Sequence, residues 1–195
     1  MGIVHKYQLI FVSIPRTGSQ SVASILSNAC DSFHSLHEHL TYFELLLSMD
    51  ENHFYSYKSF TIVRNPYTRF ESMYYEYIKR NTMVSLNEFV KILLNYYSIS
   101  IFNHRTPRYL MSQSYFCVSN GQILVDTILK FEELNSDWTD FIKNNINECY
   151  HSSVLELPHI NSSIKFENMS YTPDLNKIIN KLYYDDFVNF GYDFQ

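Results

Sequence analysis

The stretch FVSIPRTGSQS at residues 11–21 sets the expected architecture, because an apolar run there breaks into a polar turn that opens a helix. Residues 9–14 are apolar except for Ser13, which is typical of a strand buried on both faces of a parallel sheet. Apolar side chains then recur at helical spacing over residues 21–29. The sequence therefore predicts a strand, a short loop and a helix in close succession.

A second stretch, FTIVRNPYTRFES at residues 60–72, repeats this arrangement. Residues 59–63 form another apolar run, and Pro66 suits the first turn of a helix, where its missing N–H costs nothing. Both junctions carry cationic and hydroxyl side chains. Since the first N–H groups of a helix have no partner within it, each junction is suited to an anion. The two junctions together predict a site for two phosphate groups of one ligand.

Other signals complete the expected fold. Capping patterns predict helix starts at Thr41 with Glu44, Ser85 with Glu88, and Thr172 with Pro173. A helix is expected over residues 135–146, and Asn120-Gly121 predicts a hairpin or tight turn between residues 115–118 and 122–129. Alternating strands and helices indicate an α/β fold with a central, mainly parallel β-sheet flanked by helices. We expect residues 1–195 to form a single domain.

Composition excludes several classes of protein. Hydrophobic residues make up 46% of the 195, which argues against disorder, and a net charge of −5 argues against a basic surface for nucleic acid. No segment approaches the ~18 apolar residues of a membrane span, and residues 1–7 are too short and polar for a signal peptide. We therefore expect a cytoplasmic location. The three cysteines, Cys30, Cys117 and Cys149, fit no metal spacing and are expected to be reduced thiols.

The two junctions resemble the sulfotransferases that use 3′-phosphoadenosine 5′-phosphosulfate (PAPS). PRTGSQS at residues 15–21 is similar to their P-K-T-G-G-T-S loop, and RNPYTRFES at residues 64–72 matches their R-N-P-x-x-R-x-x-S motif in full. The loop differs at Arg16, where the family has Lys, and at Ser19 and Gln20. Weaker likenesses, most similar to the compact branch whose animal members sulfate carbohydrates, lie at residues 39–44, 124–132, 157–161 and 186–192.

The resemblance implies a P-loop-kinase-like core and a role for each motif residue. The loop would hold the 5′-phosphosulfate through Arg16, Thr17, Gly18, Ser19, Gln20 and Ser21. Arg16 would also stabilise the charge that grows as the sulfuryl group departs, and Arg and Lys differ in shape and in proton transfer. Arg64 and Ser72 would bind the 3′-phosphate, while Arg69 would form a structural ion pair or support the site.

A general base is needed for the proton of the acceptor hydroxyl. His39 is the first candidate, because a neutral imidazole suits that task near pH 7 and His39 lies between the two motifs. His34, His37 and Glu38 compete with it. No cysteine or pair of carboxylates flanks these histidines, so we expect no metal.

The expected function is thus transfer of a sulfuryl group from PAPS to an acceptor hydroxyl, with a saccharide as the expected acceptor. One alternative is a P-loop enzyme of the nucleotide-kinase type, although the chain lacks the G-K-[ST] ending of that loop. The other is a non-catalytic protein that binds PAPS or its product 3′,5′-adenosine bisphosphate (PAP), which Arg16 in place of Lys suggests. No nucleic acid or membrane is expected as a partner.

Overall fold

A computed structural model describes residues 2–28, 39–80, 84–98, 107–147, 154, 156–157 and 169–195. The chain divides into two compact units. The first, which we call the sheet unit, comprises Met1–Arg64 and Gln113–Asn161. The second, the helical unit, comprises Asn65–Ser112 and Ser162–Gln195. Each is described by itself below.

The sheet unit contains a four-stranded sheet in the order β1-β2-β3-β6. Its strands are β1 (Ile3–Val4), β2 (Leu9–Val12), β3 (Lys58–Val63) and β6 (Thr127–Lys130). β2, β3 and β6 run parallel, with Val12 opposite Thr61 and Val63 opposite Lys130, and β1 is antiparallel to β2. The predicted α/β fold with a mainly parallel sheet is therefore confirmed.

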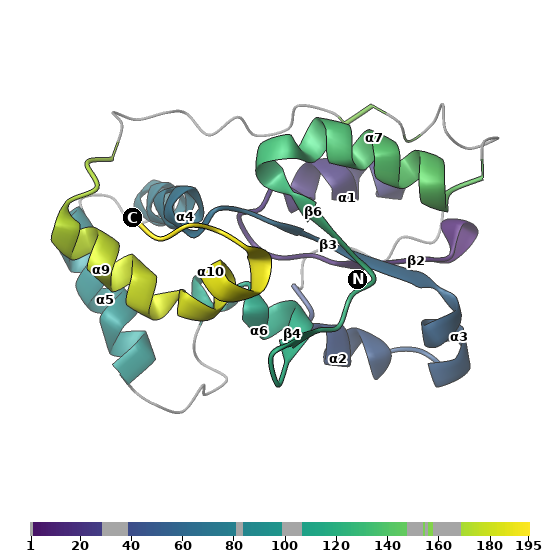
Figure 1. Ribbon diagram of the computed structural model, residues 1–195, viewed down its shortest axis with the longest axis horizontal. Coiled ribbons are helices and arrows are strands. Elements are labelled where there is room, and N and C mark those ends of the chain that lie inside the picture. The colour runs from purple at the N-terminus through teal and green to yellow at the C-terminus, as the bar shows by residue number, and fades with distance from the viewer. Residues whose placement is uncertain are drawn as a thin grey trace. The chain divides into compact units, whose positions relative to one another are not determined.

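Helices flank this sheet. In Figure 1, α1 and α7 lie over one side of the strands, and α2 and α3 lie on the other side. The remaining elements of the unit are α1 (Ser19–Asn28), α2 (Tyr42–Leu46), α3 (Glu51–Ser56), α6 (Ser114–Cys117), β4 (Val118–Ser119), β5 (Gln122–Ile123), α7 (Leu134–Asn145) and the 3-10 turns η1 (His5–Tyr7) and η3 (Phe131–Glu133). The first motif therefore forms strand β2, a loop and helix α1, as predicted.

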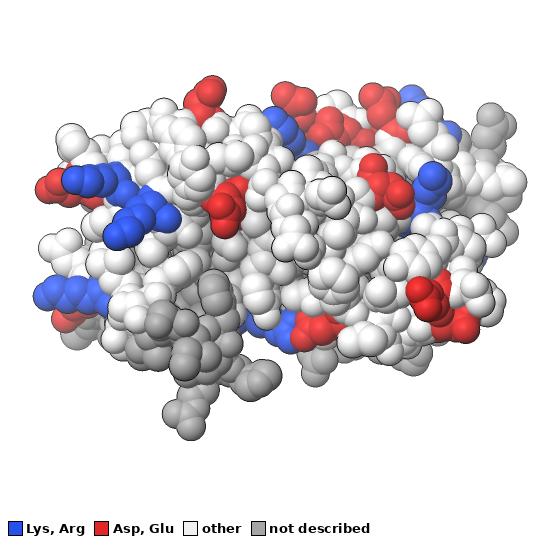
Figure 2. All heavy atoms as spheres, turned by 60° about the horizontal axis from the view of Figure 1, so that its bottom comes forward, with Lys and Arg blue, Asp and Glu red and all other residues white. Residues whose placement is uncertain are grey.

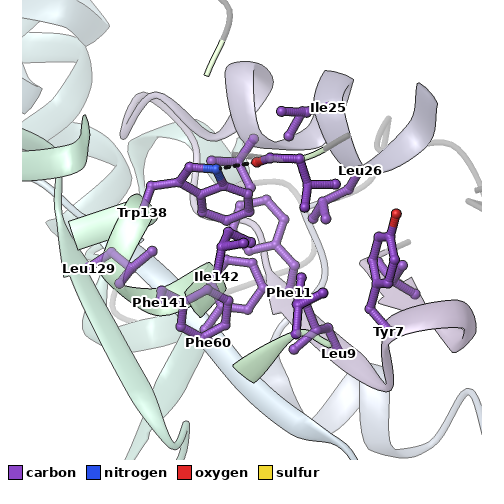
Figure 3. Close-up of a cluster of buried hydrophobic side chains, with 14 of the residues drawn as sticks. Tyr7, Leu9, Phe11, Ile25, Leu26, Phe60, Leu129, Trp138, Phe141 and Ile142 are labelled. Atoms are coloured by element: carbon purple, nitrogen blue, oxygen red, sulfur yellow. Dashed lines mark hydrogen bonds between the residues drawn. The ribbon is translucent and has the colours of Figure 1, made fainter. Parts of the chain in front are cut away.

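Aromatic side chains fill the core between the sheet and α1 and α7 (Figure 3). The rings of Phe11 on β2 and Phe60 on β3 stack with centroids 4.7 Å apart, because these residues are opposite each other in register. Trp138 of α7 is fully buried and donates its indole N–H to the carbonyl of Val154 at 2.8 Å. Large buried rings of this kind dominate core energetics, and they hold the strands whose ends carry the motifs.

The helical unit has its own apolar core. Its elements are α4 (Pro66–Arg80), α5 (Leu86–Ser98), η2 (Arg108–Leu110), α9 (Pro173–Leu182) and α10 (Tyr184–Phe190). Phe70 of α4, Phe89 of α5 and Ile179 of α9 are fully buried within it. The second motif begins this unit: the Asn65 side chain accepts the N–H of Tyr67 at 3.0 Å, and Pro66 is the first residue of α4.

The capping predictions are confirmed. Thr41 forms a complete capping box with Glu44, Ser85 and Glu88 bond reciprocally, and the Thr172 hydroxyl accepts the N–H of Leu175. The final helix, however, stops at Leu182, and α10 follows a break at Tyr183. Thr41 likewise starts only the short α2, which ends at Leu46.

The hairpin at Asn120-Gly121 is confirmed, but its arms are much shorter than expected. Both turn residues have positive φ, and they join only the two-residue strands β4 and β5. The residues before β4 form the helical turn α6, and Thr127–Lys130 joins the main sheet as β6. The alternative pairing wins because a place beside β3 buries Leu129 in the core of the sheet unit, whereas a two-stranded hairpin alone is marginally stable.

Candidate functional site

The loop between β2 and α1 has an unusual backbone. Arg16 has a φ of 68° and Gly18 a φ of 78°, so the residues on both sides of Thr17 have a left-handed backbone conformation. The hydroxyls of Thr17 and Ser19 donate to the Ile14 carbonyl at 2.9 and 3.0 Å and thereby close the turn. Alternating backbone conformations of this kind turn successive N–H groups toward one concavity, which is a common way to hold an anion.

Two of the predicted phosphate ligands are therefore partly used within the loop. The Thr17 hydroxyl donates to the Ile14 carbonyl. Thr17 would therefore contact a phosphate through its backbone N–H. The N–H of Ser21 donates to the Gly18 carbonyl at 3.1 Å, so a contact from Ser21 falls to its hydroxyl. Gln20 is exposed in the first turn of α1, where helix N–H groups favour anions.

Gly18 is required at its position for two reasons. Its positive φ is a conformation that residues with a Cβ rarely adopt. In addition, a Cβ there would lie 2.8 Å from two carbons of the Phe131 ring. Phe131 follows β6 directly and packs against the loop, so the ends of β2 and β6 are tied together at this glycine.

Arg64 comes directly after β3 and lies beside the same loop. Its guanidinium carbon is 4.3 Å from the centroid of the Phe131 ring, and its Nη1 is 3.5 Å from the Arg16 carbonyl oxygen. A cation over an aromatic face is attracted by the ring quadrupole, by about 0.5–2 kcal/mol depending on exposure. The first motif and the first residue of the second motif therefore meet at the carboxyl edge of the parallel strands.

The backbone of Arg64 is held from another direction by Gln113. The Gln113 amide oxygen accepts the N–H of Arg64 at 2.8 Å, and its amide nitrogen donates to the Arg64 carbonyl at 2.9 Å. Sequence reasoning missed Gln113 altogether and gave Phe131 no role in the site. No local pattern marks Gln113, since it is 49 residues from its partner, whereas Phe131 lies in one of the weaker likenesses.

His39 lies next to the strand that leads into the loop. Its Nδ1 is 2.9 Å from the carbonyl oxygen and 3.2 Å from the hydroxyl oxygen of Ser13, two residues before Pro15. A proton on Nδ1 donates to that carbonyl, and Nε2 then keeps its lone pair and can accept a proton. His34, His37 and Glu38, the competing candidates, lie outside the described residues.

Ser72 and Arg69 belong to the helical unit. Ser72 lies on α4 and is only 3% exposed, which differs from a serine on a helix surface. Arg69 is 1% exposed, donates from Nη2 to the Met111 carbonyl at 2.9 Å, and has its guanidinium carbon 5.9 Å from the Tyr183 ring. Arg69 thus supports its own unit, and the pairing of Ser72 with Arg64 on one phosphate stays a prediction.

A separate hollow of about 170 Å³ lies at the opposite edge of the sheet, at the amino end of β3. Tyr42, Phe54, Lys58 and Asp126 are among the residues that line it. Burial raises the pKa of the Tyr42 phenol, with nearby Tyr55 and Asp126 adding to the effect. Asp126 accepts both the N–H and the hydroxyl of Ser59 at 2.8 Å, so it supports the start of β3. No residue of the two motifs lines this hollow.

The described residues form neither a strongly charged surface on the face drawn in Figure 2 nor a group of metal ligands. In Figure 2, basic and acidic side chains are interspersed among uncharged ones, without a broad basic field on the described part of that face. Across the described residues, no group of three or more His, Cys, Asp or Glu could hold a metal ion.

No helix among the described residues is long and apolar enough to cross a membrane. Cys117 is buried and forms no disulfide, whereas Cys30 and Cys149 lie outside the described residues.

Comparison with known proteins matches the chain to a protein family. A model described as "Sulfotransferase family" matches residues 2–193, which covers nearly the whole chain and both units. A DNA-directed RNA polymerase subunit beta′ from Oedogonium cardiacum is 25% identical over 136 residues. That stretch is 69% of this chain but only 6% of the polymerase subunit, so the likeness concerns a small part of it. No solved structure matches the chain.

Proposed function

Because the chain belongs to the sulfotransferase family, we propose that it transfers a sulfuryl group from PAPS to an acceptor hydroxyl, with a saccharide as the acceptor. One observation carries the proposal: the Arg64 guanidinium lies against the loop backbone at Arg16 and over the Phe131 ring. The loop and Arg64, which we propose as the two anion-binding elements, lie side by side, and this supports a nucleotide with phosphates on both its 5′ and 3′ sides. The family match spans both units, and we propose that residues 1–195 work as one domain.

The donor nucleotide would be held by residues of both motifs. The backbone N–H groups of Gly18, Ser19 and Gln20, the N–H of Thr17 and the hydroxyl of Ser21 would surround the 5′-phosphate. Arg64 would bind the 3′-phosphate by a charge-assisted bond, which is about twice as strong as a neutral one, and Ser72 would add a second donor. The left-handed backbone at Arg16 and Gly18 supports this reading, because it shapes the loop before any ligand arrives.

Sulfuryl transfer would then proceed by in-line displacement. The acceptor oxygen forms a bond to sulfur while the bond from sulfur to the bridging phosphate oxygen breaks, and PAP leaves with the additional negative charge. His39 would take the proton of the acceptor hydroxyl on Nε2, with the ring oriented by the Nδ1 contact with Ser13. Arg16 would stabilise the charge on the leaving oxygen. Positioning and electrostatic stabilisation supply most of the rate in related phosphoryl transfers, and the same would hold here.

Arg16 changes what the loop can do, relative to the Lys of the resembled motif. Its guanidinium is planar, keeps its charge at any working pH, and can donate two parallel bonds to one anion. It can therefore stabilise the leaving oxygen but cannot hand it a proton. This residue is also the reason to keep a non-catalytic PAP-binding protein as a second candidate.

Ligand-induced stabilisation and turnover test the proposal together. A ligand that binds only the folded protein raises its stability, by about 2.7 kcal/mol at a hundredfold excess over Kd. PAPS and PAP should raise the melting temperature, and adenosine 5′-phosphosulfate, which lacks the 3′-phosphate, should do so far less. Equal shifts for all three ligands would contradict the 3′-phosphate site.

Turnover is measured with PAPS and a panel of saccharides, with mass spectrometry detecting a sulfate-sized gain on the acceptor. Sulfated product supports the enzyme, whereas stabilisation by PAP without product on any hydroxyl acceptor supports the non-catalytic binder. Activity with ATP that a chelator abolishes and Mg²⁺ restores would instead favour the kinase-type alternative.

A further inference from the structure

Just beyond the end of β3, the Gln113 side chain makes the backbone hydrogen bonds that a neighbouring strand would make. β3 ends at Val63, whose partner Lys130 is also the last residue of β6, so Arg64 lies one residue beyond the paired strands. The Gln113 side chain accepts the Arg64 N–H and donates to the Arg64 carbonyl, which is the pair of bonds that an adjacent strand would otherwise supply. The backbone of Arg64 is therefore fixed although the sheet has ended.

Gln113 is itself firmly placed. It is fully buried and comes directly before α6, and its own carbonyl accepts the N–H of Phe116 at 3.0 Å. Both polar atoms of its side chain are used by Arg64, and a buried amide is costly to leave without partners. A side chain held in this way determines the direction in which the Arg64 side chain leaves the backbone.

The other end of Arg64 is held as well. Phe131 lies under the guanidinium at 4.3 Å, and the Arg16 carbonyl lies 3.5 Å from Nη1. An arginine that is free to rotate loses about 0.5–1.5 kcal/mol of conformational freedom when a ligand immobilises it. With both ends placed in advance, Arg64 would lose less of that freedom on binding.

We infer that Gln113 is a positioning residue that gives this site its preference for nucleotides with a 3′-phosphate, although it touches no ligand itself. The inference rests on the proposed role of Arg64 as the 3′-phosphate ligand. It adds that the strength of this interaction is set by the carboxamide behind Arg64 and not by the arginine alone.

The test compares PAP with adenosine 5′-monophosphate, two nucleotides that differ only in the 3′-phosphate. Gln113→Met keeps the size of the side chain and removes both bonds to Arg64. We expect PAP to bind the variant about three- to tenfold more weakly and the monophosphate to bind as before. The loss for PAP corresponds to the conformational entropy that the more mobile Arg64 side chain would lose on binding. Titration calorimetry gives both dissociation constants, and their ratio is the readout, since a general loss of structure would weaken both ligands alike.

Thr61→Val is the matched control. The Thr61 hydroxyl is also buried and donates to a backbone carbonyl, that of Val12 at 2.7 Å, and Thr61 lies on β3, the strand that leads to Arg64. This variant should lower the melting temperature and leave the ratio of the two affinities unchanged. If Gln113→Met does not fold, Gln113→Asn keeps a buried amide that is too short to reach both groups, and it should lower the ratio in the same direction.

A double variant separates this inference from the proposed function. In an Arg64→Ala background, Gln113→Met should cause no further loss of the 3′-phosphate preference, because coupled residues do not add. If Arg64→Ala removes the preference while Gln113→Met retains it, Gln113 has only a structural role and the inference fails alone. If the unaltered protein binds both nucleotides equally, the 3′-phosphate site itself fails, and the inference fails with it.

Discussion

Two arginines of one motif have different environments in this molecule. Arg64 ends the sheet unit, is half-buried, and lies over Phe131 beside the loop. Arg69, five residues later, is almost fully buried among the helices and bonds the Met111 carbonyl. A sequence motif can thus combine a residue that is available to a ligand with one that stabilises the fold. The two arginines differ because Arg64 directly follows the end of β3, whereas Arg69 lies on the buried face of α4.

The same contrast holds for the regions around them. The sheet edge near Arg64 has positive φ values at Arg16 and Gly18, and His39 there directs Nδ1 to the Ser13 carbonyl. The surroundings of Arg69 contain the half-buried Tyr97 and the buried Tyr183, and desolvation raises the pKa of both phenols. We therefore expect substitutions near the loop to change ligand binding or turnover, and substitutions near Arg69 to change stability.

The largest effect is expected for His39→Ala. Loss of a general base typically lowers the rate by about 10²–10⁴-fold, and binding of PAPS should change little because His39 would contact the acceptor. Steady-state turnover and PAP titration measure the two quantities. His53→Ala, which removes an exposed histidine of α3 in the same unit, is the control and should leave both unchanged. Normal turnover in His39→Ala would assign the base to another residue, with His34, His37 and Glu38 the next to replace.

Arg64→Met should weaken PAPS binding by roughly ten- to a hundredfold, equivalent to about 1.5–3 kcal/mol for a bond to a charged group. The melting temperature without ligand should remain close to that of the unaltered protein. Calorimetric titration and a thermal melt test both parts. Unchanged affinity would show that Arg64 is structural, and the contrast with Arg69 would then be lost.

The same change at the other arginine, Arg69→Met, should act in the opposite way. It removes a buried donor and leaves the Met111 carbonyl without that bond, so we expect the free energy of unfolding to fall by about 1–3 kcal/mol. Chemical denaturation measures this value. Arg80→Met on the same helix is the control, because Arg80 is exposed and its ion pair with Glu76 should contribute only about 0–1 kcal/mol. If Arg69→Met is as stable as Arg80→Met, the buried arginine does not support its unit.

The smallest effect concerns alkaline pH. Burial raises the pKa of the Tyr183 phenol, so above the ordinary value of 10.0 the unfolded chain loses this proton while the folded protein keeps it. The stability that Tyr183 contributes is therefore complete below pH 10 and falls as the pH rises further. Melting temperatures from pH 8 to 11 should decline less steeply in Tyr183→Phe. Tyr184→Phe, which alters an exposed neighbour, should follow the unaltered protein, and identical slopes in all three would exclude this role for Tyr183.

Much of the local structure was predictable because it depends on short-range rules. Helix caps at Thr41, Ser85 and Thr172 require only a hydroxyl and a partner a few residues away. The Asn120-Gly121 turn needs only residues that tolerate positive φ. Where long-range burial competes, these rules fail: residues 127–130 leave the predicted hairpin arm to pair with β3, since that place in the sheet buries more apolar surface.

The sequence by itself determined the two strand–turn–helix junctions and their cationic residues, because periodicity, capping and turn preference depend on neighbours along the chain. The tertiary structure alone decided that Gln113 holds the Arg64 backbone, that Phe131 lies between Gly18 and Arg64, and that His39 directs Nδ1 to Ser13. It also decided that Arg69 is almost fully buried and Arg64 only half-buried. Each of these contacts joins residues or surfaces that come together only when the strands and helices pack, and no spacing along the chain encodes that packing.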